Sequence, residues 1–411
     1  MYHLRRSSIA SCRARPRIHL LQARSVIALA LAATFGCRDE PQAPTAPEGS
    51  AAVAAASAPL NFSQVSAGSG QSCGVTVDNR LFCWGRNDHG QVGDGSQTDR
   101  LRPTPIAQAL RFRLVSAGDL YTCAVTTDFH AFCWGQNFGA LGDGTSTERH
   151  APVRVAGKQL FRQLATGELH TCGVTLANRA FCWGDNSFGA IGDGGFGVRL
   201  TPTAVKGGLS FQLVDPGDFH TCGVTLDSLA YCWGYNKQGQ SGNNSTTVFN
   251  PSPVRVAGTR LFRQLSAGGD ATCAVTTSDK AFCWGNGFDG QLGSGDQRLA
   301  RAPRAVAGGL NFTRVTVGEA HSCGEAKSKR AYCWGTNANG QLGDGTTVNR
   351  QLSPVPVVGG LSFAQLSAGG FHTCGKTVAS LAYCWGTNFD GTLGDGTTNS
   401  TNRPVAVVGP S

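Results

Sequence analysis

Residues 372–386 read HTCGKTVASLAYCWG, and six close copies of this stretch occur earlier in the chain. Every copy ends in Cys-Trp-Gly, and these tripeptides hold all the tryptophans of the protein, namely Trp84, Trp134, Trp183, Trp233, Trp284, Trp334 and Trp385. Successive tryptophans are 49 to 51 residues apart. A regular period near 50 residues is typical of propeller blades or of a solenoid.

Within one period, alternating apolar residues predict three short strands, as at 363–367, 372–377 and 382–385. A Pro-Val segment such as Pro152-Val153 predicts a fourth strand, because proline is tolerated at a strand start or edge. Four antiparallel strands form one propeller blade. A helical solenoid would need long segments whose apolar residues recur at helical spacing, and the period lacks them. The sequence therefore predicts an all-β protein.

The two ends of the repeat region favour a closed ring. The first repeat begins at Leu60 without a preceding Pro-Val strand, whereas the last repeat ends with Pro404-Val405. We therefore expect the C-terminal strand to pair with the first blade, which would close the ring and hide both sheet edges. The prediction is a closed seven-bladed β-propeller over residues 60–411.

The repeat also resembles that of the regulator of chromosome condensation family. The resemblance is carried by Ser367-Ala368-Gly369, by His372-Thr373 and by the run from Trp334 to Gly345, WGTNANGQLGDG, and it covers residues 60 to 409. It implies a seven-bladed propeller with interlocking ends. Proteins that share this fold include a nuclear guanine-nucleotide exchange factor, a plant ultraviolet-B photoreceptor and a secreted bacterial inhibitor of β-lactamases. The resemblance therefore leaves the function open.

Fourteen cysteines form seven pairs, each with nine residues between the partners. The pairs are Cys73 and Cys83, Cys123 and Cys133, Cys172 and Cys182, Cys222 and Cys232, Cys273 and Cys283, Cys323 and Cys333, and Cys374 and Cys384. Equal offsets from the hairpin turn place the partners opposite each other on adjacent strands, so we expect seven disulfides. Buried free thiols and metal ligands are the alternatives, although one hairpin supplies only two ligands.

The first 36 residues predict an export signal, because an arginine-rich start precedes the apolar run 26–33, which is too short to span a bilayer. Gly36 before Cys37 resembles the cleavage site of bacterial lipoproteins, which implies lipidation of Cys37; plain secretion is the alternative. Residues 37–59 are rich in Ala and Pro and predict a flexible tether. We expect an exported protein, secreted or held in a bacterial cell envelope, whose only membrane contact is a lipid anchor at Cys37.

The charge distribution argues against a nucleic-acid partner. The formal net charge is +9, but six arginines before residue 37 leave about +3 on the rest. Binding to nucleic acid needs a dense basic stripe, which the sequence after residue 37 lacks. The Gly-Asp-Gly turns lack the lysine and helix of a phosphate loop and the oxygen set of a calcium site, so we interpret them as turns and expect no cofactor.

Histidines at the start of the second strand could suggest a metal ring. They occur in four repeats, at His170, His220, His321 and His372. Tyr121 and Ala271 interrupt this series. We therefore interpret the histidines as hydrogen-bonded between blades, and we expect no metal.

The turns between the first and second strands are expected at one mouth of the central channel. After the strand-ending glycine they carry the acidic residues Asp119, Glu168, Asp218 and Glu319. The next positions include Leu120, Leu169, Phe219, Asp270 and Phe371. The long loops after Trp-Gly add Phe138, Phe188, Tyr235, Phe288 and Phe389. An acidic mouth with aromatic neighbours suits a protein partner with a basic protrusion, unless these side chains pack within their own loops.

The sequence thus predicts a non-catalytic, exported scaffold for protein recognition. One alternative is a hydrolase or lyase that acts on polysaccharide with the mouth carboxylates as acid and base. Against catalysis, no triad, metal motif or nucleotide loop distinguishes one blade from another. A guanine-nucleotide exchange factor is a further alternative, but an exported protein would not meet a cytosolic or nuclear GTPase.

Overall fold

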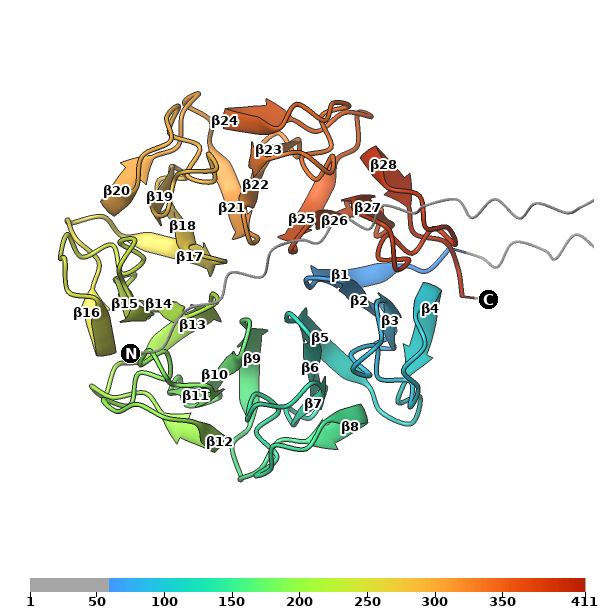
Figure 1. Cartoon of the computed structure of the whole chain (residues 1–411), viewed down its shortest axis with the longest axis horizontal. Coiled ribbons are helices and arrows are strands. Elements are labelled where there is room, and N and C mark those ends of the chain that lie inside the picture. The colour runs from blue at the N-terminus through green and yellow to red at the C-terminus, as the bar shows by residue number, and fades with distance from the viewer. Residues whose placement is uncertain (1–58, 411) are drawn as a thin grey trace, which may run out of the picture. The chain divides into compact units, whose positions relative to one another are not determined.

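The computed structural model describes residues 59–410, which form 28 β-strands in seven four-stranded sheets. Figure 1 shows these sheets arranged around a central axis as propeller blades, which confirms the predicted fold class. The predicted export signal (1–36), the lipidation site Cys37 and the tether up to residue 58 lie outside the described residues. Within 59–410, no helix is long and apolar enough to cross a membrane.

The blades follow one another along the chain, with four consecutive strands in each. Blades 1 to 3 contain β1 (Phe62–Ala67), β2 (Gln71–Thr76), β3 (Leu81–Gly85), β4 (Arg100–Ile106), β5 (Phe112–Ala117), β6 (Tyr121–Thr126), β7 (Ala131–Gly135), β8 (Arg149–Arg154), β9 (Phe161–Thr166), β10 (His170–Thr175), β11 (Ala180–Gly184) and β12 (Arg199–Ala204). Blades 4 and 5 contain β13 (Phe211–Pro216), β14 (His220–Thr225), β15 (Ala230–Tyr235), β16 (Phe249–Arg255), β17 (Phe262–Ala267), β18 (Ala271–Thr276), β19 (Ala281–Gly285) and β20 (Ala300–Ala305). Blades 6 and 7 contain β21 (Phe312–Val317), β22 (His321–Ala326), β23 (Ala331–Thr336), β24 (Arg350–Pro356), β25 (Phe363–Ala368), β26 (His372–Thr377), β27 (Ala382–Gly386) and β28 (Thr401–Ala406).

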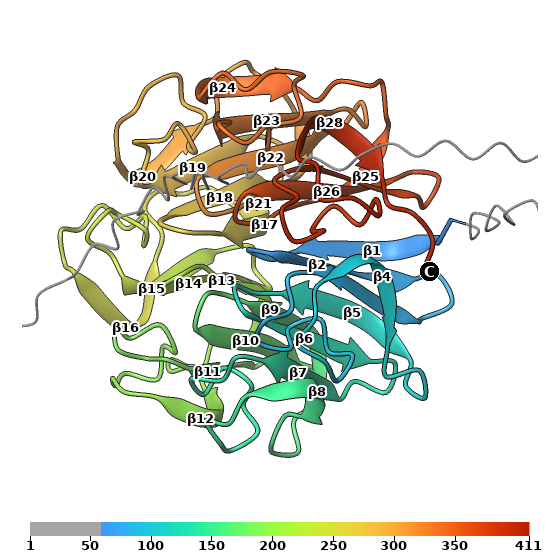
Figure 2. The same ribbon diagram turned by 45° about the vertical axis from the view of Figure 1, so that its right-hand side comes forward.

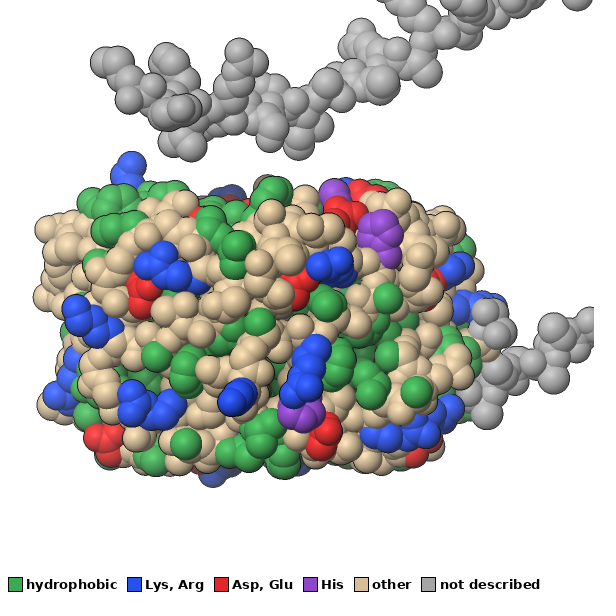
Figure 3. Space-filling view, turned by 90° about the horizontal axis from the view of Figure 1, so that it is seen from below, with side chains coloured by type: hydrophobic (Ala, Val, Ile, Leu, Met, Phe, Trp, Pro, Cys, Tyr) green, Lys and Arg blue, Asp and Glu red, His purple; other side chains and the backbone are tan. Residues whose placement is uncertain are grey.

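Each blade is antiparallel, with its strands in chain order from the axis outward. The first strands line a central channel of about 310 Å³, and the second strands are almost entirely buried. The fourth strands form the outer edge, where Pro103 and Pro404 fall at irregularities of the pairing and remove no ladder donor. Figure 3 shows the ring from its side, where exposed hydrophobic side chains lie between scattered charged ones.

The predicted closure of the ring by strand pairing is wrong. β28 pairs with β27 inside the last blade, and β4 already supplies the fourth strand of the first blade. The physical reason is that every repeat, counted from the phenylalanine of its first strand, contains all four strands. The first blade therefore lacks no strand for the C-terminus to provide.

The ring closes instead by packing β1 against β25 and β26, which lie beside it in both ribbon views (Figures 1 and 2). The backbone N–H of Val65 donates to Gln365 Oε1 at 3.1 Å, and that of Ala67 donates to Ser367 Oγ at 3.0 Å. These contacts repeat those between other neighbouring blades, such as the bond from the Ala117 N–H to Ser66 Oγ at 3.0 Å. The seam between the last and first blades thus resembles the other seams.

Tryptophan joins every blade to the preceding one. All seven indoles are fully buried. Trp84 Nε1 donates to the carbonyl oxygen of Thr392 in the last blade at 3.0 Å, and Trp134 Nε1 donates to that of Gln91 at 3.0 Å. The other five tryptophans make the same bond at 2.8 to 2.9 Å. The tryptophans therefore lie between blades.

The four histidines also lie between blades, as predicted. Each Nε2 is 2.8 Å from a hydroxyl oxygen of the next blade, in the pairs His170–Thr221, His220–Thr272, His321–Thr373 and His372–Ser72. Burial lowers the pKa of His170 and His321 to about 4 and that of His220 and His372 to about 3. These imidazoles are neutral at pH 7 and serve as hydrogen-bonding groups of the interior.

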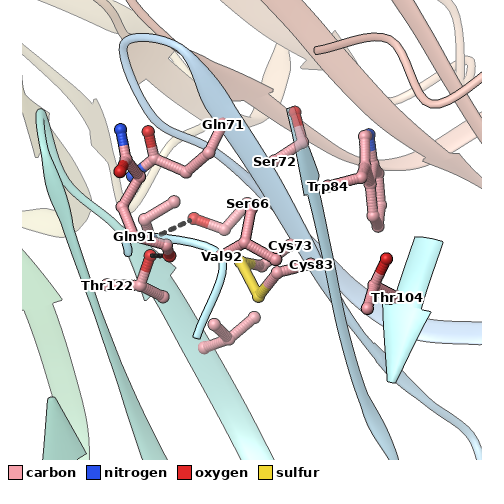
Figure 4. The surroundings of a disulfide bond; sticks show 12 residues. Ser66, Gln71, Ser72, Cys73, Cys83, Trp84, Gln91, Val92, Thr104 and Thr122 are labelled. Carbon is pink, nitrogen blue, oxygen red and sulfur yellow. Dashed lines mark hydrogen bonds between the residues drawn. A yellow bond between two sulfur atoms is a disulfide. The ribbon is translucent and has the colours of Figure 1, made fainter. Parts of the chain in front are cut away.

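All seven predicted disulfides form. The partners oppose each other on the second and third strands with Cα atoms 4.0 to 4.1 Å apart, as in the bond between Cys73 and Cys83. Figure 4 shows this bond beside Val92, within a blade core where neither cysteine is exposed. Disulfides persist in oxidising environments and are rare in the cytosol. Seven of them indicate an extracellular or otherwise oxidising location.

Side chains of the first strands join neighbouring blades around the channel. Gln64 donates to the carbonyl oxygen of Val115 at 2.8 Å and accepts from its N–H at 3.0 Å. Blade 6 has Arg314 at the position of Gln64. There Glu325 of β22 accepts a hydrogen bond from the N–H of Leu366 instead. Glu325 occupies a position that is valine in the first five blades. Its carboxyl oxygen accepts the hydrogen bond that a glutamine accepts in blade 1, and the carboxyl group is buried as a result.

Glu325 is expected to make the stability of the ring depend on pH. Burial raises the pKa of Glu325 to about 7, against a weaker opposing effect of the Leu366 N–H. Between about pH 4.5 and pH 7, Glu325 stays protonated in the folded protein but ionises in the unfolded chain. The stability that the protonated carboxyl group contributes is therefore fully present below about pH 4.5 and is lost as the pH rises through 7. We expect Glu325→Gln to be more stable than the wild type at pH 8 by up to about 3 kcal/mol, with a smaller difference at pH 5.

The measurement is denaturant unfolding of both proteins between pH 5 and pH 8. Asp227→Asn, at an exposed position in the hairpin of blade 4, controls for removal of a charge. A difference between wild type and Glu325→Gln that does not change with pH would contradict the assignment.

Candidate functional site

A hollow of about 210 Å³ lies at one mouth of the channel, and we call it the mouth hollow. It is lined in all seven blades by the end of the first strand and the two residues that follow, as in Ala117-Gly118-Asp119. The first of the two following residues is always glycine. A Cβ on Gly68 would collide with the carbonyl oxygen of Gly118, and the corresponding glycine in every other blade meets its neighbour in the same way. The glycines thus let the blades approach closely, and the next residues surround the opening.

The structure brings the predicted acidic residues together at this mouth. Asp119, Glu168, Asp218 and Glu319 all line the mouth hollow. Asp270 lies on the adjacent turn, where its Oδ1 accepts a hydrogen bond from Gln240 Nε2 at 2.7 Å. Among the described residues that line the mouth hollow, none is Lys or Arg. The opening therefore concentrates acidic side chains, and none of its described lining residues is a cation.

These carboxyl groups influence one another. Burial, and then the charges of Asp119 and Glu319, raise the pKa of Glu168 to about 7. Burial and the neighbouring carboxylates, Glu168 first, hold the pKa of Asp218 well above its usual range. Burial also raises the pKa of Asp270 and, together with Asp119, that of Glu319. A bound cation would favour the ionised forms of these groups and relieve their repulsion.

The predicted aromatic residues fall into two groups. Four are exposed, namely Phe138, Phe288, Phe371 and Phe389. Phe188, Phe219 and Tyr235 are half-buried and pack together, with ring centroids of Phe188 5.0 Å from Phe219 and 5.4 Å from Tyr235. Leu120 and Leu169 are also half-buried. The alternative that some of these side chains pack between their own loops therefore describes blades 3 and 4.

Sequence reasoning missed two aromatic residues beside this cluster. Phe249 lies 6.0 Å from both Phe188 and Tyr235, and Phe196 lies 6.4 Å from Phe249, measured between ring centroids. Phe196 and Phe249 are 53% and 42% exposed. The signal of Phe196 in the sequence was a large apolar residue in a loop where other repeats carry Gln, Ser or Thr. Phe249 is the first residue of β16, where blades 1 and 2 carry the acidic residues Asp99 and Glu148.

A second hollow, of about 430 Å³, lies beside the mouth hollow at blades 6, 7 and 1. Asp119 and Glu319 line both hollows, and Arg86, Phe371 and Phe389 line only the second. Arg86 pairs with Asp88 at 2.5 Å. This side of the mouth is therefore of mixed charge.

The Gly-Asp-Gly turns have a structural role. Asp94 Oδ1 accepts hydrogen bonds from the N–H and hydroxyl of Ser96 at 3.0 and 2.8 Å, and its Oδ2 pairs with Arg100 at 2.5 Å. Asp143 and Asp193 form equivalent ion pairs with the arginine six residues later. These carboxylates are thus occupied within their own loops. Among the described residues, no cluster of three or more His, Cys, Asp or Glu could hold a metal ion.

Comparisons with known proteins agree with this fold. A search of the curated proteins found no match. The solved structure of human WBSCR16 is similar, with 21% identity, 76% of this chain and 85% of that chain covered, and a TM-score of 0.68. Prp20p from Saccharomyces cerevisiae has 20% identity, coverage of 75% and 80%, and a TM-score of 0.67. The ectodomain of the receptor kinase CR4 from Physcomitrella patens has 21% identity, coverage of 80% and 74%, and a TM-score of 0.53.

At such identities these likenesses show the fold alone. The family models are more specific. Residues 330–375 match the regulator of chromosome condensation (RCC1) repeat, and residues 31–310, more than half of the chain, match the RCC1-like domain. The chain therefore belongs to the RCC1-like domain family.

Proposed function

We propose that this protein is an exported binding module that recognises a protein partner with the mouth face of its propeller, and that it has no catalytic role. The observation that carries the proposal is the mouth hollow, where four carboxyl groups converge beside exposed aromatic side chains and no Lys or Arg of the described part of the chain lines the wall. Unpaired like charge is costly in a fold, and aromatic side chains dominate the energy of interfaces.

Three further observations support this proposal. The blades are stapled by disulfides and joined by hydrogen bonds, so the loops stand on a rigid frame, as is usual in recognition domains. Prp20p, which is similar in fold, was studied for its binding to Gsp1p and histones, and it was also crystallised bound to Kap60. The disulfides favour export, and we include lipid anchoring at Cys37 in the proposal.

The test is a pull-down from cell-envelope and culture fractions with the wild type and with Asp119→Asn/Glu168→Gln/Asp218→Asn/Glu319→Gln. We expect this variant to retain about tenfold less partner, because the amides keep the shape of the mouth but remove its charge. The matched control changes the opposite face, at exposed apolar residues of the hairpins between second and third strands, with Val77→Ser/Leu176→Ser/Leu226→Ser/Val378→Ser. Equal retention by the mouth variant, or loss only in the control, would refute the mouth as the binding site.

A polysaccharide-acting hydrolase or lyase is the second candidate, and one observation favours it. The raised pKa of Glu168 would keep a general acid protonated near pH 7, beside carboxylates that could act as base. If the wild type releases sugar from envelope polysaccharide and Glu168→Gln does not, this candidate replaces the binding module.

A further inference from the structure

The mouth face is not symmetric, although the repeats are. Large exposed apolar residues concentrate in the long loops of blades 3 and 4 and at the start of β16, at Phe196, Val198, Val248 and Phe249. Counted from the Gly-Asp-Gly turn, the positions that correspond to Phe196 in other blades carry Gln97, Ser146, Thr347 and Thr398. A departure from the repeat pattern that exposes apolar surface is unfavourable in water, and such surfaces usually mark an interaction site.

Five aromatic rings of these two blades form one continuous patch. We define the aromatic patch as Phe196, Phe249, Phe188, Tyr235 and Phe219. Phe249 contacts Phe196, Phe188 and Tyr235, and Phe188 also contacts Tyr235 and Phe219, with ring centroids 5.0 to 6.4 Å apart. The rings at one end are exposed and those toward the mouth are half-buried.

The aromatic patch reaches the mouth hollow. Phe219 directly follows Asp218, which lines that hollow. At the same end, the charge of Asp270 adds to burial in raising the pKa of Tyr235. Apolar and acidic surface therefore adjoin on one side of the opening. On the other side, Phe389 is 73% exposed but forms no ring contact with another described residue, and it lines a hollow that already contains Arg86.

We propose, on the basis of the proposed function, that the aromatic patch and the mouth hollow form one elongated site for an extended polypeptide segment. Apolar side chains of that segment lie on the aromatic patch, and one Lys or Arg side chain enters the mouth hollow. The charge of the hollow selects a cationic side chain, because its described lining residues offer carboxylates and no basic residue. The same carboxylates repel anionic lipid headgroups, so a polypeptide fits the site better than a membrane surface.

The experiment selects a phage-displayed library of random linear peptides on the full chain, purified from an oxidising compartment. We expect enriched peptides to combine aromatic or aliphatic residues with a Lys or Arg. The affinity of the best synthetic peptide is then measured by fluorescence anisotropy. We expect it to fall about tenfold or more for Phe196→Ser/Phe249→Ser and for Glu168→Gln/Asp218→Asn, but not for the control Leu226→Ser/Val378→Ser on the opposite face.

Three outcomes would overturn the inference. Enriched peptides without a cationic residue, or no enrichment, would refute the assigned chemistry. Peptides that lose affinity on Phe389→Ser and not on Phe196→Ser/Phe249→Ser would place the site on the other side of the mouth, and the proposed function would stand. Co-sedimentation of the wild type, but not of Phe196→Ser/Phe249→Ser, with phosphatidylcholine vesicles would identify the aromatic patch as a lipid contact.

Discussion

Reduction of the disulfides is expected to unfold the propeller under conditions in which the oxidised protein is fully folded. Each bridge closes a loop with a sequence separation of 10, for which the chain-entropy model gives about 2–3 kcal/mol. Seven such bridges amount to about 14–21 kcal/mol, which is as large as or larger than the ~5–15 kcal/mol by which folded domains are usually stable. The reduced chain should therefore lack a cooperative transition.

The measurement is circular dichroism and thermal unfolding of the oxidised protein and of protein that was reduced in denaturant and refolded with reductant present. Loss of one bridge, with Cys222→Ala/Cys232→Ala, should leave a folded ring whose Tm is about 3–4 °C lower, because a structure of about 350 ordered residues unfolds with a large entropy. A reduced protein that refolds with an unchanged Tm would show that packing alone stabilises the blades.

The period of the sequence predicted most of the fold. The cysteine pairs could be placed because equal offsets from one turn put Cys73 opposite Cys83, whatever the rest of the chain does. The tryptophans and histidines repeat in register, so their places between blades followed from the ring. The mode of closure was predicted wrongly, because the start of a repeat is arbitrary in a sequence and the first repeat was taken to lack a fourth strand. In the structure β4 pairs with β3 and β28 pairs with β27.

The candidate site could be predicted only in part. The acidic turns follow a glycine that recurs in every blade, so Asp119 and Glu168 could be assigned to the mouth. Phe196 and Phe249 could not, since Phe196 lies in an irregular loop and meets Phe249, at the start of β16, across two blades. Glu325 was missed for another reason. Its role depends on a missing partner in the neighbouring strand, where Arg314 replaces a glutamine.

The seam between the last and first blades is expected to be the weakest point of the ring. The chain runs across every other seam, whereas this one is held by packing of β1 against β25 and β26 and by hydrogen bonds such as those from β1 to β25. Trp84→Ala should cost about 3–5 kcal/mol, because it leaves a cavity and removes the bond to the Thr392 carbonyl oxygen. The corresponding fall in Tm is about 4–7 °C.

The matched control is Trp233→Ala, which opens an internal seam with the same contacts, including the bond to the Ala190 carbonyl oxygen at 2.8 Å. We expect similar losses of Tm from the two variants but different local opening. Amide hydrogen exchange should rise in β1, β25 and β26 for Trp84→Ala, because the two blades there can separate without stretching the chain, and should stay near the wild-type rate in these strands for Trp233→Ala. Equal exchange of these strands in both variants would mean that the ring opens only as a whole, with no seam weaker than the others.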